Sequence, residues 1–147
     1  MMKSKRFEPI REIASSSAKD SSRAMGEAAR KVADMERQLE QLKSYRDEYV
    51  RNSQSSGATD AVKLQNYRSF LDRLGEAMRQ QAATLEMARA EYEKRREHWS
   101  EKRIEAERLS LVVDRFRKEE QHAADRREQR EGDEAALRSS LAARREA

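Results

Sequence analysis

The chain has 147 residues, of which 36% are hydrophobic, 5% aromatic and 41% charged. A compact globular domain of this length needs more apolar side chains to fill its interior, so the composition excludes an ordinary globular core. Lys and Arg total 32 against 28 Asp and Glu, and the net charge of +4 is too small to indicate nucleic-acid binding by itself.

The residue types favour long helices. The chain has 4 glycines and 1 proline, too few for the turns of a β-sheet protein, and its lack of cysteine excludes a disulfide framework. No stretch approaches the roughly 18 apolar residues of a membrane-spanning helix, and the N-terminus lacks the apolar core of a secretory signal. These features predict a soluble, intracellular helical protein, with a mostly disordered chain as the competing interpretation.

The first predicted element is a helix over residues about 9–50. Pro9 suits its first turn, because the N–H groups there have no intrahelical partner. An apolar stripe at three- and four-residue spacing follows, and such a stripe lies along one face of a helix that needs a partner. Its members are Met25, Ala28, Val32, Met35, Leu39, Leu42 and Tyr49.

A turn is predicted over residues about 51–60, where polar turn-forming residues interrupt the apolar rhythm. Gly57 can take a positive φ there, and either Thr59 or Asp60 can cap the helix that follows.

The second predicted helix covers residues about 61–130 and carries an apolar or large residue at every third or fourth position for about eight heptads. The stripe consists of Leu64, Tyr67, Leu71, Leu74, Met78, Gln81, Leu85, Ala88, Tyr92, Arg95, Trp99, Lys102, Ala106, Leu109, Val113 and Phe116. Two such stripes separated by a short turn predict an all-α fold, a long antiparallel two-helix coiled-coil hairpin forming a single domain over residues 1–147. The second helix should overhang the first beyond about residue 106, and its tail, weakened by Gly132, should fray toward residue 147.

Catalytic and metal chemistry find no support in the sequence. His98 and His122 lie on predicted helix surface, without a concave site to exclude water. The acidic residues alternate with Arg and Lys at helical spacing, which predicts intrahelical ion pairs rather than an acid and base pair or a metal site. No glycine-rich phosphate loop is present. We therefore expect no enzymatic activity, no cofactor and no metal.

Two aromatic residues lie beside the stripes and close to the turn. Tyr45 is off the line from Leu42 to Tyr49, and Phe70 is off the line from Tyr67 to Leu71, so a hairpin should bring both rings together. With neighbouring residues they form a patch wide enough to dock a partner protein. The alternative is that these rings pack over the seam of their own hairpin.

The chain resembles the FliJ family, small coiled-coil proteins of the bacterial flagellar export apparatus. The resemblance is carried by Gln38-Leu39-x-x-Leu42-x-x-Tyr45-x-x-x-Tyr49, a Ser/Gly turn, and Asn66-Tyr67-x-x-Phe70-Leu71-x-x-Leu74-x-x-Ala77. It covers nearly the whole length, with its specific part within residues 38–81. Proteins of this family are antiparallel two-helix coiled coils similar in shape to the rotor stalk of rotary ATP synthases.

The resemblance implies a non-enzymatic stalk and adaptor in flagellar type III protein export. The end with both termini would enter the pore of the hexameric export ATPase, and the face near the turn would contact the cytoplasmic domain of the membrane export gate. The protein would also escort export chaperones, and it would be cytoplasmic, held by its partners at the inner membrane at the flagellar base. The family's gate-contact positions correspond to Gln38, Leu42, Tyr45, Tyr49, Phe70, Leu74 and Ala77, whereas Gln81 departs from the pattern, because some relatives have histidine there.

Two other functions fit the same pattern. One is the equivalent coiled-coil protein of a virulence type III secretion system, which would share shape and partner classes. The other is a general scaffold or nucleic-acid-binding coiled coil using the basic N-terminus with Arg126, Arg127 and Arg130, although the near balance of charges leads us to expect no nucleic-acid partner.

Overall fold

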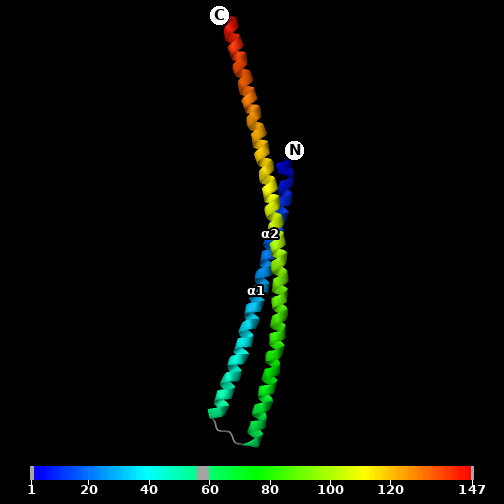
Figure 1. Ribbon diagram of the computed structural model, residues 1–147, viewed down its shortest axis with the longest axis vertical. Helices are drawn as coiled ribbons and strands as arrows, with labels where there is room; N and C mark the ends of the chain where they lie inside the picture. Colours follow the sequence, from blue (N-terminus) through cyan, green and yellow to red (C-terminus); the bar gives the residue numbers. More distant parts are fainter. Residues whose placement is uncertain (1, 56–59, 147) are drawn as a thin grey trace. The chain divides into compact units, whose positions relative to one another are not determined.

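Two helices make up almost all of the part of the chain that the computed structural model describes, residues 2–55 and 60–146 (Figure 1). Helix α1 spans Lys3–Ser55 and helix α2 spans Ala61–Glu146. They pack against each other as a hairpin, which confirms the predicted all-α, two-helix fold. No strand occurs in these described ranges.

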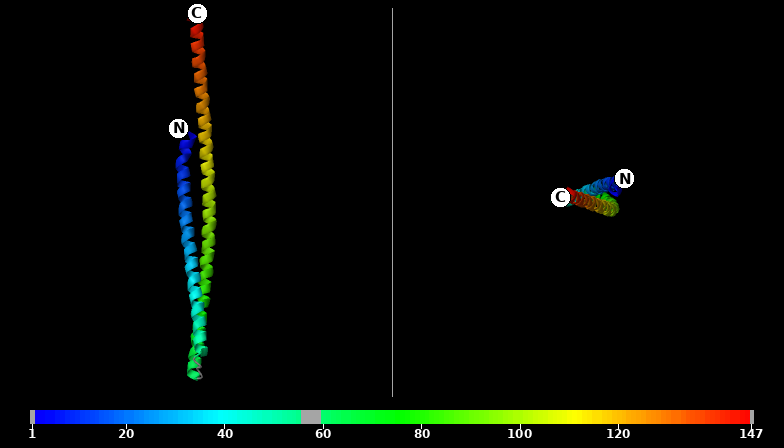
Figure 2. Two further views of the ribbon diagram at one scale, coloured as in Figure 1. Left: turned by 90° about the vertical axis from the view of Figure 1, so that its left-hand side faces the viewer. Right: turned by 90° about the horizontal axis from the view of Figure 1, so that it is seen from above.

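The helices contribute to two compact units. We call residues 1–18 with residues 102–147 the terminal unit, and Lys19–Glu101 the hairpin unit. Each unit holds a stretch of α1 beside a stretch of α2, running in opposite directions (Figure 2). The assignment of the chain to a single domain stays a prediction.

The predicted apolar stripes form the seam between the helices. All seven members of the α1 stripe are half-buried, and in the α2 stripe Leu64 and Arg95 alone are exposed. The most buried apolar residues are Leu74, Leu85 and Ala88 in the hairpin unit and Val113 in the terminal unit. Removing these side chains from water stabilises the pairing by about 1.5–3 kcal/mol for each fully buried Leu or Val. Periodicity therefore identified the face of each helix that packs.

Helix α1 begins earlier than the sequence predicts. It starts at Lys3 and includes Pro9 within its length, so the predicted start near Pro9 is wrong. A proline inside a helix removes one backbone hydrogen bond, a cost that helix propensity alone does not offset. Contacts from Ser4 and Phe7 to α2 compensate for that loss in the terminal unit.

Asp60, one of the two predicted capping residues, caps the start of α2. The backbone N–H of Val62 donates to Asp60 Oδ1 at 3.1 Å, and the N–H of Leu64 donates to the Asp60 carbonyl at 3.0 Å. Asp60 thus has the N-cap position, where a short acidic side chain accepts an otherwise unpaired amide. Gly57 and Thr59, which the predicted turn also used, lie outside the described residues. Helix α1 extends to Ser55, so the predicted end near residue 50 is too early.

The C-terminal part of α2 differs from the prediction in two ways. The helix ends at Glu146 rather than near residue 130, because Ala, Leu and Arg favour helix and the basic residues Arg144 and Arg145 complement the helix dipole in its last turn. The overhang also begins later than residue 106, since Glu120 still contacts α1 and every residue over 124–146 is exposed. The early start of α1 accounts for this longer pairing. Fraying of this tail stays a prediction.

Candidate interaction surfaces

Four aromatic rings meet near the turn and form what we call the aromatic cluster. Tyr45 and Tyr49 come from α1, and Tyr67 and Phe70 come from α2. Tyr49 lies centrally, with ring centroids 4.2 Å from Phe70 and 5.5 Å from Tyr67, the latter pair stacked at 14°. Tyr45 meets Phe70 edge to face at 5.9 Å and 73°. The prediction that Tyr45 and Phe70 come together is confirmed.

The rings of the aromatic cluster are unequally exposed. Tyr49, Tyr67 and Phe70 are half-buried, whereas Tyr45 is 52% exposed. The three half-buried rings therefore pack largely within their own hairpin, as the seam alternative holds. Tyr45 differs, because more than half of its surface is available to another molecule, as the docking alternative requires.

The other residues assigned by family resemblance lie along the same unit at different depths. Leu74 is 8% exposed and Leu42 is half-buried, so both belong to the seam between the helices. Gln38 and Ala77 are exposed. Gln81 Nε2 donates to Gln38 Oε1 at 3.0 Å across the two helices, and it reaches the Met35 carbonyl at 3.5 Å. Contact of any of these residues with an export gate stays a prediction.

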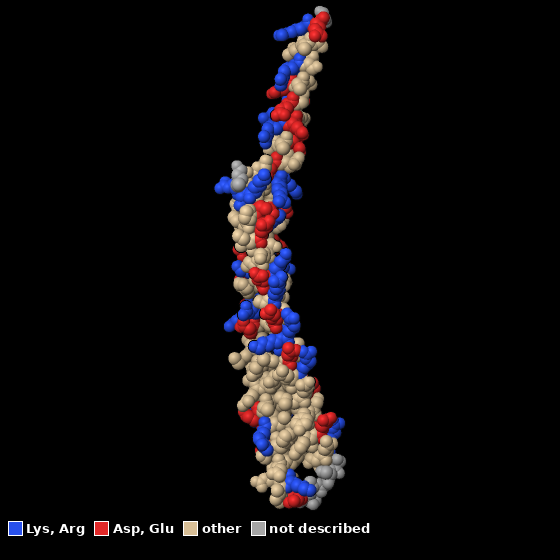
Figure 3. All heavy atoms as spheres, turned by 180° about the vertical axis from the view of Figure 1, so that it is seen from behind, with Lys and Arg blue, Asp and Glu red and all other residues tan. Residues whose placement is uncertain are grey.

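One face of the hairpin unit carries a surface that is poor in charge. On the face drawn in Figure 3, uncharged side chains gather over part of the hairpin unit toward the turn, with charged side chains at the edges of this area. Uncharged surface together with an exposed aromatic ring, here that of Tyr45, is typical of protein-docking sites, which are depleted in charged residues at their centre. This part of the hairpin unit is therefore the strongest candidate for a docking site.

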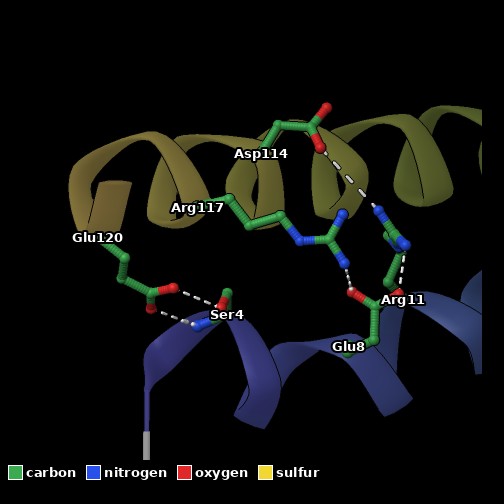
Figure 4. Close-up of polar contacts among 6 residues, drawn as sticks. All are labelled: Ser4, Glu8, Arg11, Asp114, Arg117 and Glu120. Atoms are coloured by element: carbon green, nitrogen blue, oxygen red, sulfur yellow. Dashed lines mark hydrogen bonds and ion pairs between the residues drawn. The ribbon is translucent and has the colours of Figure 1, made fainter. Parts of the chain in front are cut away.

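A second set of contacts, which we call the terminal clasp, joins the helices in the terminal unit (Figure 4). It consists of Ser4, Glu8, Arg11, Asp114, Arg117 and Glu120. Glu120 of α2 binds the first turn of α1: the Ser4 backbone N–H donates to Oε1 at 3.1 Å, and the Ser4 hydroxyl donates to Oε2 at 2.6 Å. The carboxylate satisfies an amide that α1 itself leaves unpaired, and so acts as an N-cap supplied by the neighbouring helix.

Ion pairs continue the terminal clasp along α1. Arg117 contacts Glu8 at 2.8 Å, Arg11 contacts Asp114 at 4.0 Å, and Glu8 also pairs with Arg11 on its own helix. Glu8 thus holds an arginine from each helix. Charges matched in this way fix which residues of α1 and α2 lie opposite each other.

The electrostatics of Glu120 follow from these contacts. Hydrogen bonds from the Ser4 side chain and then from its backbone N–H lower the pKa of Glu120 below its usual 4.5, with smaller contributions from Arg117 and Lys5. Each of these groups favours the charged carboxylate. Beside it, Phe7 and Phe116 pack with ring centroids 5.3 Å apart, and the Lys3 ammonium lies 5.6 Å from the Phe116 centroid.

The sequence interpretation missed the terminal clasp. A signal was present, because Asp114, Arg117 and Glu120 alternate in sign at three-residue spacing beside the stripe, as flanking charges of coiled coils do. The predicted start of α1 near Pro9 left Ser4 and Glu8 outside the helix. The donors of Ser4 and the negative charge of Glu8 therefore had no assigned partner on α2.

The described parts of the chain hold neither a candidate metal site nor a candidate membrane-spanning segment. Over residues 2–55 and 60–146, no three or more His, Cys, Asp or Glu side chains gather as metal ligands would, and neither helix holds an apolar stretch able to cross a bilayer. His98 and His122 are both exposed.

Comparison with known proteins gives one match. Residues 2–145 match the family model described as flagellar FliJ protein. The matched range includes the aromatic cluster and the terminal clasp. No curated protein and no solved structure matches this chain.

Proposed function

This chain belongs to the FliJ flagellar protein family, and on that premise we propose that it links the hexameric export ATPase to the membrane export gate and escorts export chaperones. Family membership makes the chain a non-enzymatic component of the flagellar export apparatus. The proposal adds the partners and the mechanical role to that assignment. It also places the protein on the cytoplasmic side of the inner membrane, at the flagellar base.

The observation that carries the proposal is the half-exposed ring of Tyr45 at the edge of the aromatic cluster. An aromatic side chain held in place by a neighbouring ring loses little conformational freedom on binding, and such residues contribute most of the energy of protein interfaces. Phe70 provides the neighbouring ring. These features support docking of the export gate on the hairpin unit near the turn.

The ATPase-binding end is proposed from family membership, and no individual residue is assigned to it. The terminal unit holds the exposed end of α2, where residues 124–146 have no helical partner within the described residues. An uncovered helix of alternating charge suits insertion among the charged loops of a ring-shaped partner. Export chaperones would use other charged surface.

The first experiment tests the gate contact through Tyr45. Tyr45→Ala should weaken binding of the purified gate cytoplasmic domain by about tenfold or more, the loss typical of an interface hot spot. Helix content measured by circular dichroism should stay unchanged, because much of the ring faces solvent. Met87→Ala is the matched control, since Met87 is 75% exposed in the same unit but lies outside the aromatic cluster.

Equal gate binding by wild type and Tyr45→Ala would contradict the assignment of this docking face. A pull-down with the hexameric export ATPase tests the other end, and truncation after residue 123 should reduce ATPase capture while leaving gate binding intact. Loss of both activities on truncation would contradict the assignment of different ends to the two partners.

The rival functions have separate tests. The flagellar family match favours flagellar export over a virulence secretion system, and neighbouring flagellar rather than effector genes would agree with it. Nucleic-acid binding through Arg126, Arg127 and Arg130 would give duplex affinity that falls steeply with salt. Absence of duplex binding at low salt would remove that rival.

A further inference from the structure

A shallow concavity lies on α1 beside the exposed ring of Tyr45. Its lining residues are Arg37, Glu40, Gln41, Ser44, Tyr45 and Glu48. All of them belong to the hairpin unit, and their spacing places them along one face of a single helix. The concavity thus continues the proposed docking site outward from the aromatic cluster.

The concavity carries uncompensated negative charge. Glu40 and Glu48 are exposed, and neither forms an ion pair within residues 2–55 and 60–146. Arg37 is the lining residue of opposite sign, but its guanidinium pairs with Asp34 on the same helix. The two glutamates therefore present their charge to whatever occupies the concavity.

The ring of Tyr45 also favours a positively charged group in the concavity. A cation placed over the face of an aromatic ring is attracted by its quadrupole, and arginine stacks on such rings more often than lysine does. Phe70 meets Tyr45 edge to face at 73°, which holds the ring in place beside the two glutamates. An aromatic face flanked by carboxylates on one wall is matched by a planar guanidinium with several N–H donors.

From this charge complementarity we propose that the concavity receives an arginine side chain of the export gate, stacked on Tyr45 and bonded to Glu40 and Glu48. This inference rests on the proposed gate contact and specifies its chemistry. Docking is then directed by an apolar contact at the aromatic cluster and by a charged contact next to it. The charged contact makes the affinity depend on ionic strength, which an aromatic contact alone does not.

The test neutralises the two glutamates without changing their shape. Glu40→Gln with Glu48→Gln should weaken gate binding, measured by calorimetry in low salt, by about tenfold, because a charged interfacial bond is lost. Raising the salt concentration should weaken wild-type binding several-fold but change binding of the double variant much less. The matched control is Glu12→Gln with Glu27→Gln, which removes the same charge from exposed positions of α1 outside the concavity, and it should stay within about twofold of wild type.

Variants of Tyr45 test the stacking. Tyr45→Phe keeps the aromatic face and should bind within about twofold of wild type, whereas Tyr45→Leu keeps apolar bulk without a π-system and should lose about fivefold or more. Combining Tyr45→Leu with the two glutamine changes should cost less than the sum of the separate losses, because one cation contacts both groups.

Two results would overturn the inference, and they differ in what else they affect. Gate binding by wild type that is insensitive to salt and to the two glutamine changes would exclude a cationic occupant and leave the proposed function intact. Absence of gate binding by wild type at any salt concentration would overturn the proposed function together with this inference.

Discussion

The terminal unit and the hairpin unit join the same two helices by different chemistry. In the hairpin unit the aromatic cluster and the buried Leu74, Leu85 and Ala88 are accompanied by a cross-helix ion pair, from Arg89 to Glu36 at 3.1 Å. In the terminal unit a single fully buried valine, Val113, lies near the polar terminal clasp. Apolar burial is non-directional, whereas hydrogen bonds and ion pairs require particular partners.

This difference assigns separate tasks to the two units. Packing of apolar side chains gives most of the stability, so the hairpin unit should persist over a wide range of salt and pH. The terminal clasp contributes less free energy but selects which residues face each other, and it should weaken when charges are screened or protonated. Substitutions in each unit test this division.

The largest effect is expected in the hairpin unit. Leu74→Ala should lower the free energy of unfolding by about 3 kcal/mol, because it removes a buried side chain from the seam and leaves a cavity. Urea denaturation followed by circular dichroism measures the loss. Val62→Ala, at a position 64% exposed on the same helix, should change stability by less than about 0.5 kcal/mol. Similar losses in both variants would show that the apolar seam is not what stabilises this unit.

A smaller loss is expected in the terminal unit. Val113→Ala should lower the free energy of unfolding by about 2 kcal/mol, since Val113 is 0% exposed but loses only two methyl groups. Leu111→Ala is its control, because Leu111 is 68% exposed two residues away. Hydrogen exchange should show the loss of protection mainly around residues 102–123. A uniform loss over both helices would mean that the two units unfold together.

The terminal clasp should respond to acid. Because hydrogen bonds from Ser4 hold the pKa of Glu120 below 4.5 in the folded protein, the unfolded chain binds this proton more readily. The contribution of the contact between Glu120 and Ser4 is therefore complete above about pH 4.5 and is lost as the pH falls through the lowered pKa of Glu120. The amide resonance of Ser4 should follow this titration in NMR spectra.

Glu120→Gln provides the variant for the same measurement. It should abolish the acid-dependent shift of the Ser4 amide and increase hydrogen exchange there several-fold, while the aromatic cluster keeps its protection. Glu119→Gln is the control, because Glu119 is exposed next to Glu120 in the sequence. This variant should leave the acid-dependent shift of the Ser4 amide intact. An acid-dependent shift of the Ser4 amide that persists in Glu120→Gln would contradict the capping role of Glu120.

The smallest effect is expected for the uncharged polar contact of Gln81 within the hairpin unit. Gln81→Met should change the free energy of unfolding by about 0.5 kcal/mol or less, because the bond from Gln81 to Gln38 is exposed and water replaces it. The urea midpoint should also be equally insensitive to added salt in both proteins. A loss comparable to that of Leu74→Ala would contradict the view that apolar packing dominates this unit.

Sequence periodicity predicted the seam and the meeting of two rings, because both follow from helical geometry within a short distance of the turn. Tyr45 and Phe70 are 25 residues apart and lie near the turn, so small errors in helix pairing accumulate over a short length of each helix. Asp60 was predicted as a cap for the same reason, since its partner amide lies two residues away. Local or nearly local contacts are the ones that pattern reveals.

The terminal clasp could not be predicted in this way. Ser4 and Glu120 are 116 residues apart, so their pairing depends on the accumulated offset of two long helices. A proline at position 9 also argued locally for a helix start, and contacts with α2 outweighed that preference. Likewise, no apolar stripe predicts the concavity beside Tyr45, because the spacing of its glutamates is that of any solvated helix surface.

The capping of α1 by Glu120 has a consequence for the order of events during synthesis. Glu120 is synthesised 116 residues after Ser4, so the first turn of α1 has no capping carboxylate until that part of α2 has been made. Over that interval the amides at the start of α1 are solvated, and nascent-chain factors can reach them. Closure of this turn therefore requires that the part of α2 around Glu120 has been synthesised and has folded.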